Sequence, residues 1–285
     1  MFVVAGVSGR TGRIAASTLL ARGEPVRVLV RDAAKGQEWK DRGAEVAVAE
    51  LDDVPALTRA LRGAEGAYVL LPPQPTSTDS RDDNAKRTEG LVAAIEESGV
   101  AHVVFLSSVA AHLPSGTGPI ISPHDAEIAL RQVKADVTFI RAAYFMENLA
   151  MSLHALEQGA FPTFLDADHP IAMVATADIG KLAADALLAG GRGKSVIELA
   201  GPRDYTPRDV AKALSEIVGK PVTVQVGPID AMPQALAGAG LNAHWAALYQ
   251  EMTHGLNTGH VTWEGTNIVR GSTPLEVVLK TLTSS

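Results

Sequence analysis

The sequence contains no cysteine among its 285 residues. This absence excludes disulfides, a thiolate nucleophile, an iron–sulfur cluster and a zinc site built from cysteines. Any redox chemistry must therefore use electrons that a bound cofactor carries. The histidines His244, His254 and His260 do not follow a compact metal-ligand spacing, so we expect no metal site.

The chain also lacks an excess of positive charge. Its 25 Lys and Arg residues stand against 32 Asp and Glu residues, which gives a net charge of −7 and no electrostatic reason to expect nucleic acid or an anionic membrane as a partner. No apolar run approaches the roughly 20 residues of a membrane span. No charged segment precedes the apolar N-terminus, as a signal peptide would require. We expect a cytoplasmic protein with a small-molecule substrate, and we consider a homodimer.

The first half of the chain alternates between strand and helix signals. Apolar runs without polar alternation indicate strands that are buried on both faces, as in a parallel sheet. Repeated strand–helix units of about 25 residues favour an α/β, doubly wound Rossmann domain. The expected strands cover residues 2–5, 26–30, 45–51, 67–71 and 103–106, and the expected helices cover 12–21, 33–42, 53–62 and 80–98.

The pattern changes in the second half of the chain. We expect a Rossmann domain over residues 1–150 and a smaller substrate-binding lobe over 151–285, with some segments returning to the Rossmann sheet. A helix over 207–218 is well signalled, because Thr206 is a good N-cap, Pro207 suits the first helical position and Gly219 follows the end. The other expected elements are helices over 124–134 and 177–188 and strands over 137–140, 171–174, 195–199 and 222–226.

The most informative motif is a glycine turn between the first strand and the first helix. Gly6, Gly9 and Gly12 follow the spacing Gly-x-x-Gly-x-x-Gly, which is related to the dinucleotide fingerprint. Gly6 permits a tight turn, Gly9 lets a pyrophosphate approach the backbone, and Gly12 permits close contact between helix and strand. The free N–H groups of the helix N-terminus would then bind the phosphates.

The end of the second strand indicates which dinucleotide binds. A site for NAD favours an acid there, and a site for NADP favours a base for the 2′-phosphate. Arg31 falls at this strand end, and Arg10 in the glycine turn adds a second guanidinium, a group that binds phosphate in a bidentate manner. We therefore expect NADP(H) to be preferred over NAD(H). The alternative is a solvated surface pair between Arg31 and Asp32.

At this point the sequence resembles the NmrA-like family of atypical short-chain dehydrogenases/reductases. The resemblance extends from Met1 to about Pro228. Its motifs are Gly6 to Gly12, Val30-Arg31-Asp32, Leu51-Asp52-Asp53, Leu70 to Pro73, Phe105 to Val109, Ser122-Pro123-His124, Phe139 to Asn148, Ala177 to Gly180 and Gly201-Pro202.

The resemblance implies a Rossmann domain with a smaller C-terminal substrate lobe, and a bound NAD(P)H. The family includes reductases of quinones and dyes, and also regulators that bind the dinucleotide and sense redox state. The cofactor-binding residues that we expect are Gly6, Ser8, Gly9, Arg10, Thr11, Gly12, Arg31, Asp52, Leu71, Pro72 and Ser107.

The resemblance also reveals a departure. Typical short-chain dehydrogenases carry Tyr-x-x-x-Lys on the helix after the fifth strand, where the tyrosine donates a proton. Here His124 stands near the tyrosine position and Ile128 at the lysine position. Carbonyl reduction by the standard mechanism is not expected, but an acceptor that delocalises charge through a π-system needs positioning more than a strong acid.

The residues after the fifth and sixth strands are the candidates for chemistry and substrate binding. Histidine is the residue type that commonly exchanges a proton at physiological pH, so His124 is a candidate proton donor, or else a structural residue at a helix start. Ser107 and Ser108 close the fifth strand, where ligands bind in such folds, although a simple turn also explains them. We take His124 and Ser108 as catalytic candidates. The candidates for the substrate pocket, which also suit a plain core, are Tyr144, Phe145 and Asn148.

Our first hypothesis is an NADPH-dependent oxidoreductase that transfers hydride to a small conjugated acceptor such as a quinone. The second hypothesis is a regulator that senses NAD(P)H without turnover and binds a protein partner, which the absent Tyr/Lys pair favours. The third is a specialised biosynthetic reductase of an aromatic intermediate. Apolar side chains in the second half, among them Phe161, Phe164 and Trp245, favour a substrate pocket and hence an enzyme.

Overall fold

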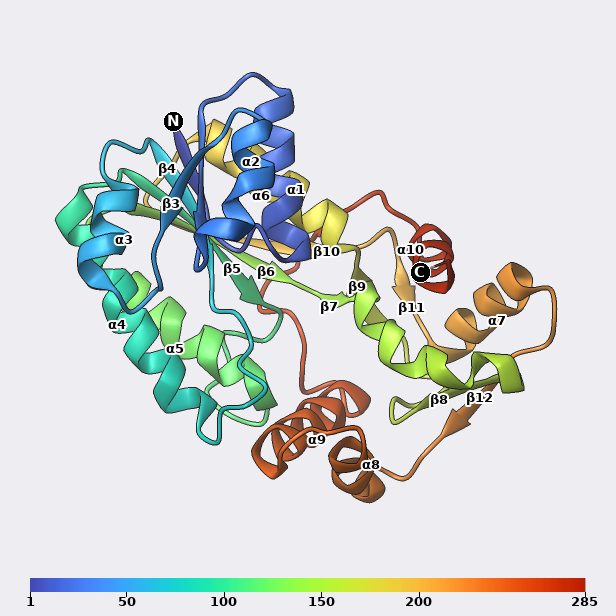
Figure 1. Cartoon of the computed structure of the whole chain (residues 1–285). Coiled ribbons are helices and arrows are strands. Elements are labelled where there is room, and N and C mark those ends of the chain that lie inside the picture. The colour runs from blue at the N-terminus through green and yellow to red at the C-terminus, as the bar shows by residue number, and fades with distance from the viewer. Residues whose placement is uncertain (285) are drawn as a thin grey trace.

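The computed structural model describes residues 1–284 and is built around one parallel sheet of eight strands (Figure 1). The strands follow the order β3-β2-β1-β4-β5-β6-β10-β13, and each recorded pairing in this sheet is parallel. This confirms the predicted Rossmann class. The strands are β1 (Phe2–Val4), β2 (Val26–Val30), β3 (Glu45–Val48), β4 (Gly66–Leu70), β5 (His102–Ser108), β6 (Asp136–Ala142), β10 (Lys194–Ala200) and β13 (Val269–Arg270).

Helices cover both faces of the sheet, which is why its strands read as continuous apolar runs. On one face α1 (Arg10–Ala21), α2 (Gln37–Asp41) and α6 (Thr176–Ala189) share a hydrophobic core with the strands, and the short 3-10 helix η1 (Ala33–Gly36) precedes α2. On the other face α3 (Val54–Leu61), α4 (Ser80–Ser98) and α5 (Ile121–Leu130) form a second core (Figure 1).

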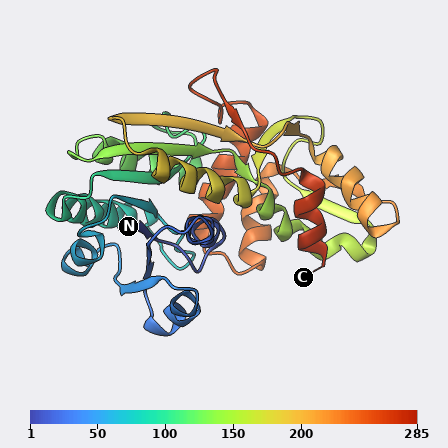
Figure 2. The same cartoon turned by 90° about the horizontal axis from the view of Figure 1, so that it is seen from above.

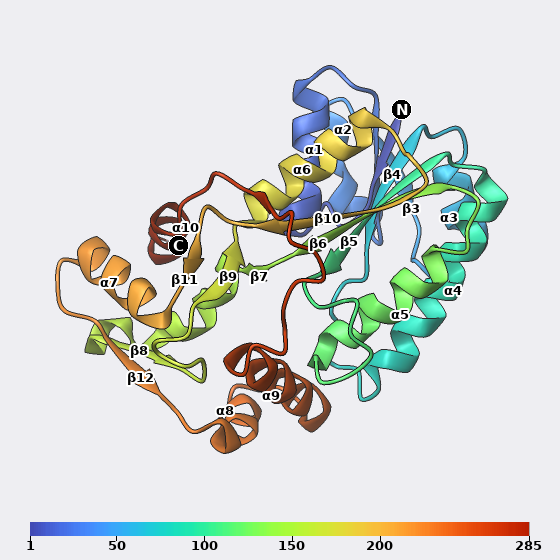
Figure 3. The same cartoon turned by 180° about the vertical axis from the view of Figure 1, so that it is seen from behind.

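A smaller lobe with its own hydrophobic core lies beyond one end of the sheet (Figures 1 and 3). It contains a three-stranded sheet in the order β11-β9-β7 and a two-stranded sheet of β8 and β12. Its strands are β7 (Tyr144–Phe145), β8 (Ala160–Thr163), β9 (Ile171–Val174), β11 (Asp204–Tyr205) and β12 (Thr223–Val226). Its helical segments are η3 (Met146–Gln158), α7 (Pro207–Val218), η4 (Ile229–Ala231), α8 (Met232–Gly238), α9 (Ala243–Asn257) and α10 (Leu275–Thr283).

The second half of the chain also contributes to the large sheet. Strand β10 pairs with β6 from Lys194 to Leu199, and β13 adds two residues beyond it. Figure 2 shows the gold strand β10 beside the green strands of the first half. A division of the chain near residue 150 stays a prediction, since the segments that follow supply both α6 and two strands of the Rossmann sheet.

Most elements were predicted to within a few residues. Helix α7 has the expected cap, because the Thr206 hydroxyl accepts from the Asp209 N–H and the Asp209 carboxylate accepts from the Thr206 N–H. Helix α5 begins three residues before the predicted start, since the 3-10 turn η2 (Gly118–Ile120) leads directly into it. Strand β13 was not predicted because it has only two residues, both exposed.

Candidate dinucleotide groove and acceptor pocket

The candidate site lies at the carboxyl edge of the large sheet, where the strand order reverses. The chain proceeds from β1 outward to β2 and β3, and then returns to the other side of β1 to continue with β4, β5 and β6. Such a switch point leaves a crevice next to β1, and ligands of open α/β sheets bind there. The glycine turn follows β1 at this position.

The glycine turn has a backbone that requires glycine at two positions. Gly6 has a φ of +69°, and a Cβ there would lie 2.6 Å from the Cδ2 atom of Leu70. A Cβ on Gly12 would lie 2.4 Å from the carbonyl oxygen of Ala5 and 2.5 Å from that of Gly6. The first turn of α1 therefore rests directly on the backbone after β1.

The N-terminus of α1 is open to an anion. Its N-cap is Gly9, which supplies no side-chain cap, and its first turn contains no acidic residue. Ser8 and Arg10 are exposed at this turn. Thr11 is buried, and its hydroxyl oxygen accepts a hydrogen bond of 2.9 Å from Tyr68. Unpaired N–H groups and the helix dipole favour negative charge at this point.

A groove runs from the glycine turn along the ends of β2, β3 and β4. Its floor is apolar and includes Leu29, Ala49 and Leu70. Two cations, Arg31 and Lys35, line its wall after β2. Neither forms an ion pair in the described part of the chain, and the Asp32 carboxylate accepts from the Ala34 N–H. The alternative pairing of Arg31 with Asp32 is therefore not formed.

Arg87 on α4 lines the groove as well. Its Nη1 atom is buried and has no hydrogen-bond partner among residues 1–284. A buried donor without a partner is costly, and a ligand that accepts its hydrogen bond removes the cost. The unpartnered guanidinium, the two free cations and the close approach at Gly12 all fit a phosphorylated dinucleotide. Arg31, Lys35 and the first turn of α1 would hold its phosphates.

A second cavity, of about 210 Å³, opens at the ends of β5 and β6. It contains Ser108 and the three residues predicted for the substrate pocket, Tyr144, Phe145 and Asn148. We call this cavity the acceptor pocket. The rest of its wall consists of apolar side chains and Tyr249, and three of these residues come from α9. The other lining residues are Val109, Pro119, Ile120, Pro123, Ala143, Tyr249, Met252, Leu256 and Val261.

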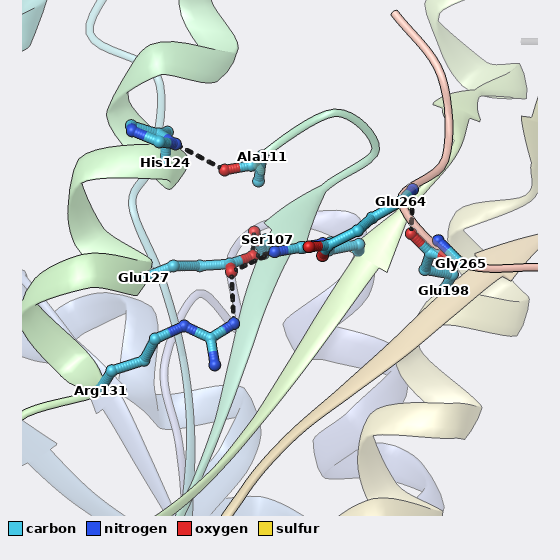
Figure 4. A network of polar contacts seen from close by, with 9 residues as sticks. Ser107, Ala111, His124, Glu127, Arg131, Glu198, Glu264 and Gly265 are labelled. Carbon is cyan, nitrogen blue, oxygen red and sulfur yellow. Dashed lines mark hydrogen bonds and ion pairs between the residues drawn. The ribbon is translucent and has the colours of Figure 1, made fainter. Parts of the chain in front are cut away.

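Ser107 does not line the acceptor pocket, and its hydroxyl belongs to a buried ionic network (Figure 4). Its hydroxyl donates to the Oε1 atom of Glu127 at 2.6 Å. Arg141 donates to both carboxylate oxygens of Glu127, at 2.9 and 2.7 Å, and also pairs with Glu264. Although burial opposes the charge, the hydrogen bonds to Glu127 and Glu264 raise the pKa of Arg141. The role of Ser107 in cofactor binding stays a prediction.

Glu264 extends the network to the C-terminal part of the chain. Hydrogen bonding to Arg141 lowers the pKa of the Glu264 carboxyl. The backbone N–H groups of Glu264 and Gly265 donate to Glu198 on β10, at 2.9 and 3.0 Å (Figure 4). These contacts attach the segment after α9 to the large sheet. The same segment carries Val261 to the acceptor pocket.

His124 lies beside the acceptor pocket, one residue after Pro123. Its Nδ1 atom is 2.8 Å from the carbonyl oxygen of Ala111 (Figure 4). A carbonyl only accepts, so Nδ1 carries the proton and Nε2 is the free atom of the neutral ring. Ile128, at the position of the family's lysine, is 53% exposed and does not line the acceptor pocket. The catalytic role of His124 stays a prediction.

The structure thus divides the predicted residues among several places. Of the predicted cofactor residues, Gly6, Ser8, Arg31 and Pro72 line the groove. Gly9, Arg10, Thr11 and Gly12 lie at the start of α1 beside it, and Asp52, Leu71 and Ser107 are not in its lining. Sequence reasoning missed Lys35, Arg87 and Tyr249. Tyr249 lies among other apolar residues of the C-terminal part, and Lys35 follows Arg31 by four residues, in η1. Nothing in the sequence distinguished Arg87 from the other charged residues of α4.

Two observations concern other classes of function. Among residues 1–284, no helix is both long and apolar enough to cross a membrane. Over the same residues, no three His, Asp or Glu side chains cluster in a way that would hold a metal ion.

The fold and the groove define a dinucleotide-binding protein of the Rossmann class. The sequence model of the NmrA-like family matches residues 1–261 of this chain. The chain belongs to the NmrA-like family, which confirms the resemblance seen in the sequence.

Characterised relatives and solved structures match most of the chain. An NAD(P)H azoreductase of Xenophilus azovorans is 28% identical over 88% of this chain and 86% of its own length. Quinone oxidoreductase 2 of Escherichia coli is 27% identical over 88% of this chain and 91% of its own. A crystal structure of the NADPH-dependent quinone oxidoreductase of Escherichia coli, complexed with NADPH, superposes with a TM-score of 0.86 at 26% identity, over 99% of this chain and 100% of that one.

Proposed function

We propose that this protein is a reductase that transfers hydride from NADPH to a small, conjugated, quinone-like acceptor. The observation that carries the proposal is the position of two complementary cavities at one edge of the sheet. The groove beside β1 has free cations, and the acceptor pocket beside β5 and β6 is apolar. A dinucleotide and an oxidised aromatic compound would bind side by side there.

The groove supports NADPH in preference to NADH. Arg31 and Lys35 line the groove after β2, where they would bind the 2′-phosphate of the adenosine ribose, and neither forms an ion pair within residues 1–284. The 2′-phosphate, which NADH lacks, adds up to about two negative charges that these cations would bind. When bound, NADPH supplies a hydride and is oxidised to NADP⁺.

The relatives support the same reaction class. The azoreductase and the quinone oxidoreductase both reduce conjugated acceptors, according to their names. Such acceptors need no Tyr/Lys pair, because the π-system spreads the charge that arrives with the hydride. His124 is a candidate for the proton, and only its Nε2 atom is free to take up and release one.

The test is NADPH oxidation by the purified protein with a panel of neutral quinones, followed by absorbance, with NADH in parallel. Quinone-dependent oxidation that is faster with NADPH than with NADH would support the proposal. Cofactor binding without turnover of any acceptor would contradict it and favour a sensor of NAD(P)H that acts on a protein partner.

A cytoplasmic location and a homodimer belong to the same proposal as expectations from the sequence. Sedimentation of the purified protein with and without NADPH would test the dimer, since a monomer of 29.8 kDa is readily distinguished from a species of twice that mass.

A further inference from the structure

Among residues 1–284, no charged side chain lines the acceptor pocket, and this limits which acceptors it can bind. Its polar groups are a serine hydroxyl, two tyrosine hydroxyls and one amide, from Ser108, Tyr144, Tyr249 and Asn148. A charged acceptor would lose its hydration in this cavity without gaining a counter-ion. The nearby carboxylate of Glu127 is already committed to Ser107 and Arg141.

The two tyrosines belong to different parts of the fold. Tyr144 lies on β7, directly after the end of β6, and Tyr249 lies on α9. Tyr249 packs against Trp245 and the small core between α8 and α9, so its ring has a fixed neighbour on that helix. The acceptor pocket is therefore lined by one tyrosine from β7 and another from α9.

Both phenols remain protonated and are available as donors. Burial raises the pKa of Tyr144 to about 12, and the neighbouring Tyr249 acts in the same direction. Burial also raises the pKa of Tyr249. Asn148 hydrogen-bonds to the Tyr144 side chain, and neither phenol O–H donates to a carbonyl or carboxylate elsewhere in residues 1–284. Each O–H is therefore free to donate to a molecule in the pocket.

We propose that the acceptor pocket selects an uncharged, planar quinone, whose carbonyl oxygen receives hydrogen bonds from Tyr144 and Tyr249, over cationic and anionic dyes. The inference rests on the proposed reductase function. A quinone that takes up a hydride gains one electron pair, and its negative charge resides on a carbonyl oxygen. One proton then completes the hydroquinone. Donors fixed at that oxygen stabilise the charge as it develops.

The experiment compares kcat/KM for three acceptors at saturating NADPH. They are a neutral naphthoquinone, a cationic triarylmethane dye and a sulfonated azo dye. We expect the quinone to exceed both dyes by about tenfold or more, because each dye must leave its ionic hydration behind. Equal or higher kcat/KM for either dye would overturn the inference while leaving the reductase function in place.

Variants test the two hydroxyls directly. Tyr249→Phe and Tyr144→Phe should each lower kcat/KM for the quinone by about tenfold to a hundredfold, since each removes one donor to a developing oxyanion. NADPH binding, measured by fluorescence, should not change. Tyr205→Phe is the matched control, because Tyr205 is buried in the same lobe but does not line the pocket.

A third variant tests the charge argument without removing a hydroxyl. Asn148→Asp places a carboxylate in the acceptor pocket at nearly constant volume. It should raise the ratio of dye-cation to quinone turnover by about tenfold, because the pocket then offers a counter-ion.

Unchanged quinone turnover in both phenylalanine variants, with thermal melting equal to the wild type, would overturn the role of the tyrosines. Absence of NADPH oxidation with every acceptor would overturn the reductase function itself.

Discussion

At the scale of single residues, the groove is lined by three cations that have no ion-pair partner among residues 1–284, and by one carboxylate, that of Glu50. Arg31, Lys35 and Arg87 all line it, but they approach from two sides. Arg31 and Lys35 follow β2, whereas Arg87 belongs to α4 on the opposite face of the sheet. This separation implies that they bind different parts of one dinucleotide, and the two parts can be tested separately.

Arg31→Ala should weaken NADPH binding by about tenfold to a hundredfold and NADH binding by less than about twofold, because a bidentate guanidinium–phosphate contact is lost only with the 2′-phosphate. Titration of each cofactor by fluorescence measures both constants. An equal loss for the two cofactors would exclude the 2′-phosphate role of Arg31.

Arg87→Met should weaken NADPH and NADH by the same factor, about tenfold, because it removes a donor to the adenosine portion that both cofactors share. Lys86→Met is a suitable control, since Lys86 lies beside Arg87 on α4 but pairs with Asp82 at the surface. A loss confined to NADPH would instead assign Arg87 to the 2′-phosphate.

At the scale of elements, the first strand and helix are joined by a contact that no side chain tolerates. Gly12→Ala would bring a methyl group to 2.4 Å from the Ala5 carbonyl oxygen, so α1 must shift away from β1. We expect a loss of stability of about 1–3 kcal/mol together with weaker binding of both cofactors. Denaturant unfolding measures the first effect and fluorescence the second.

Gly238→Ala serves as the control for this variant. Gly238 ends α8, and a Cβ there would meet no atom within 4 Å. The stability of the Gly238→Ala variant should differ from that of the wild type by less than about 1 kcal/mol, and we expect the difference to be a gain. If Gly12→Ala were equally neutral, the close approach of α1 to the backbone after β1 would not matter for folding.

The contacts of α5 depend on a buried carboxylate. Glu127→Ala leaves Arg141 without its main partner in the interior, and we expect a loss of about 3–5 kcal/mol. Asp125→Ala on the same helix removes an ion pair with Arg81 at the surface and should cost less than about 1 kcal/mol. Similar losses in the two variants would contradict the importance of burial for this network.

The elements show which parts of the site a sequence can reveal. The glycine turn was predictable because its backbone geometry restricts the residue type at fixed spacing. The partner of Ser107 was not predictable. Glu127 is twenty residues away in the sequence, and its contact with Ser107 depends on how α5 packs against the sheet. Tyr249 was likewise not assigned to the pocket, because its position depends on how α9 packs against the sheet and not on local pattern.

At the scale of the whole molecule, two buried phenols connect stability to pH. Burial raises the pKa of Tyr144 to about 12 and raises that of Tyr68 as well, whereas unfolded tyrosine titrates near 10. Between these values the unfolded chain has released protons that the folded chain still holds. The stabilising contribution of these two phenols is therefore fully present below about pH 10 and is lost as the pH rises toward 12.

Melting temperatures between pH 8 and 11.5 would measure this fall. Tyr144→Phe should decline less steeply above pH 10 than the wild type, because one of the perturbed groups is gone. Parallel curves for the two proteins would show that the Tyr144 phenol ionises as easily in the folded chain as in the unfolded one.

The order of the sheet was predictable in outline for the first half of the molecule, since each strand there is followed by its own covering helix. The later strands were harder to assign. Strand β10 reaches the large sheet after a passage through the smaller lobe, and β13 is held by only two residues. Such pairings depend on contacts between segments that are distant in the sequence.

Helix α9 has a further consequence for how this protein can change over evolutionary time. Its first turn is anchored to the loop after β4, where the Trp245 indole donates to the Gln74 carbonyl oxygen at 2.7 Å, and its later turns form part of the acceptor pocket. None of its residues lines the dinucleotide groove. Substitutions in residues 243–257 can therefore diversify the compounds that descendants of this chain accept, while the inherited cofactor half stays the same.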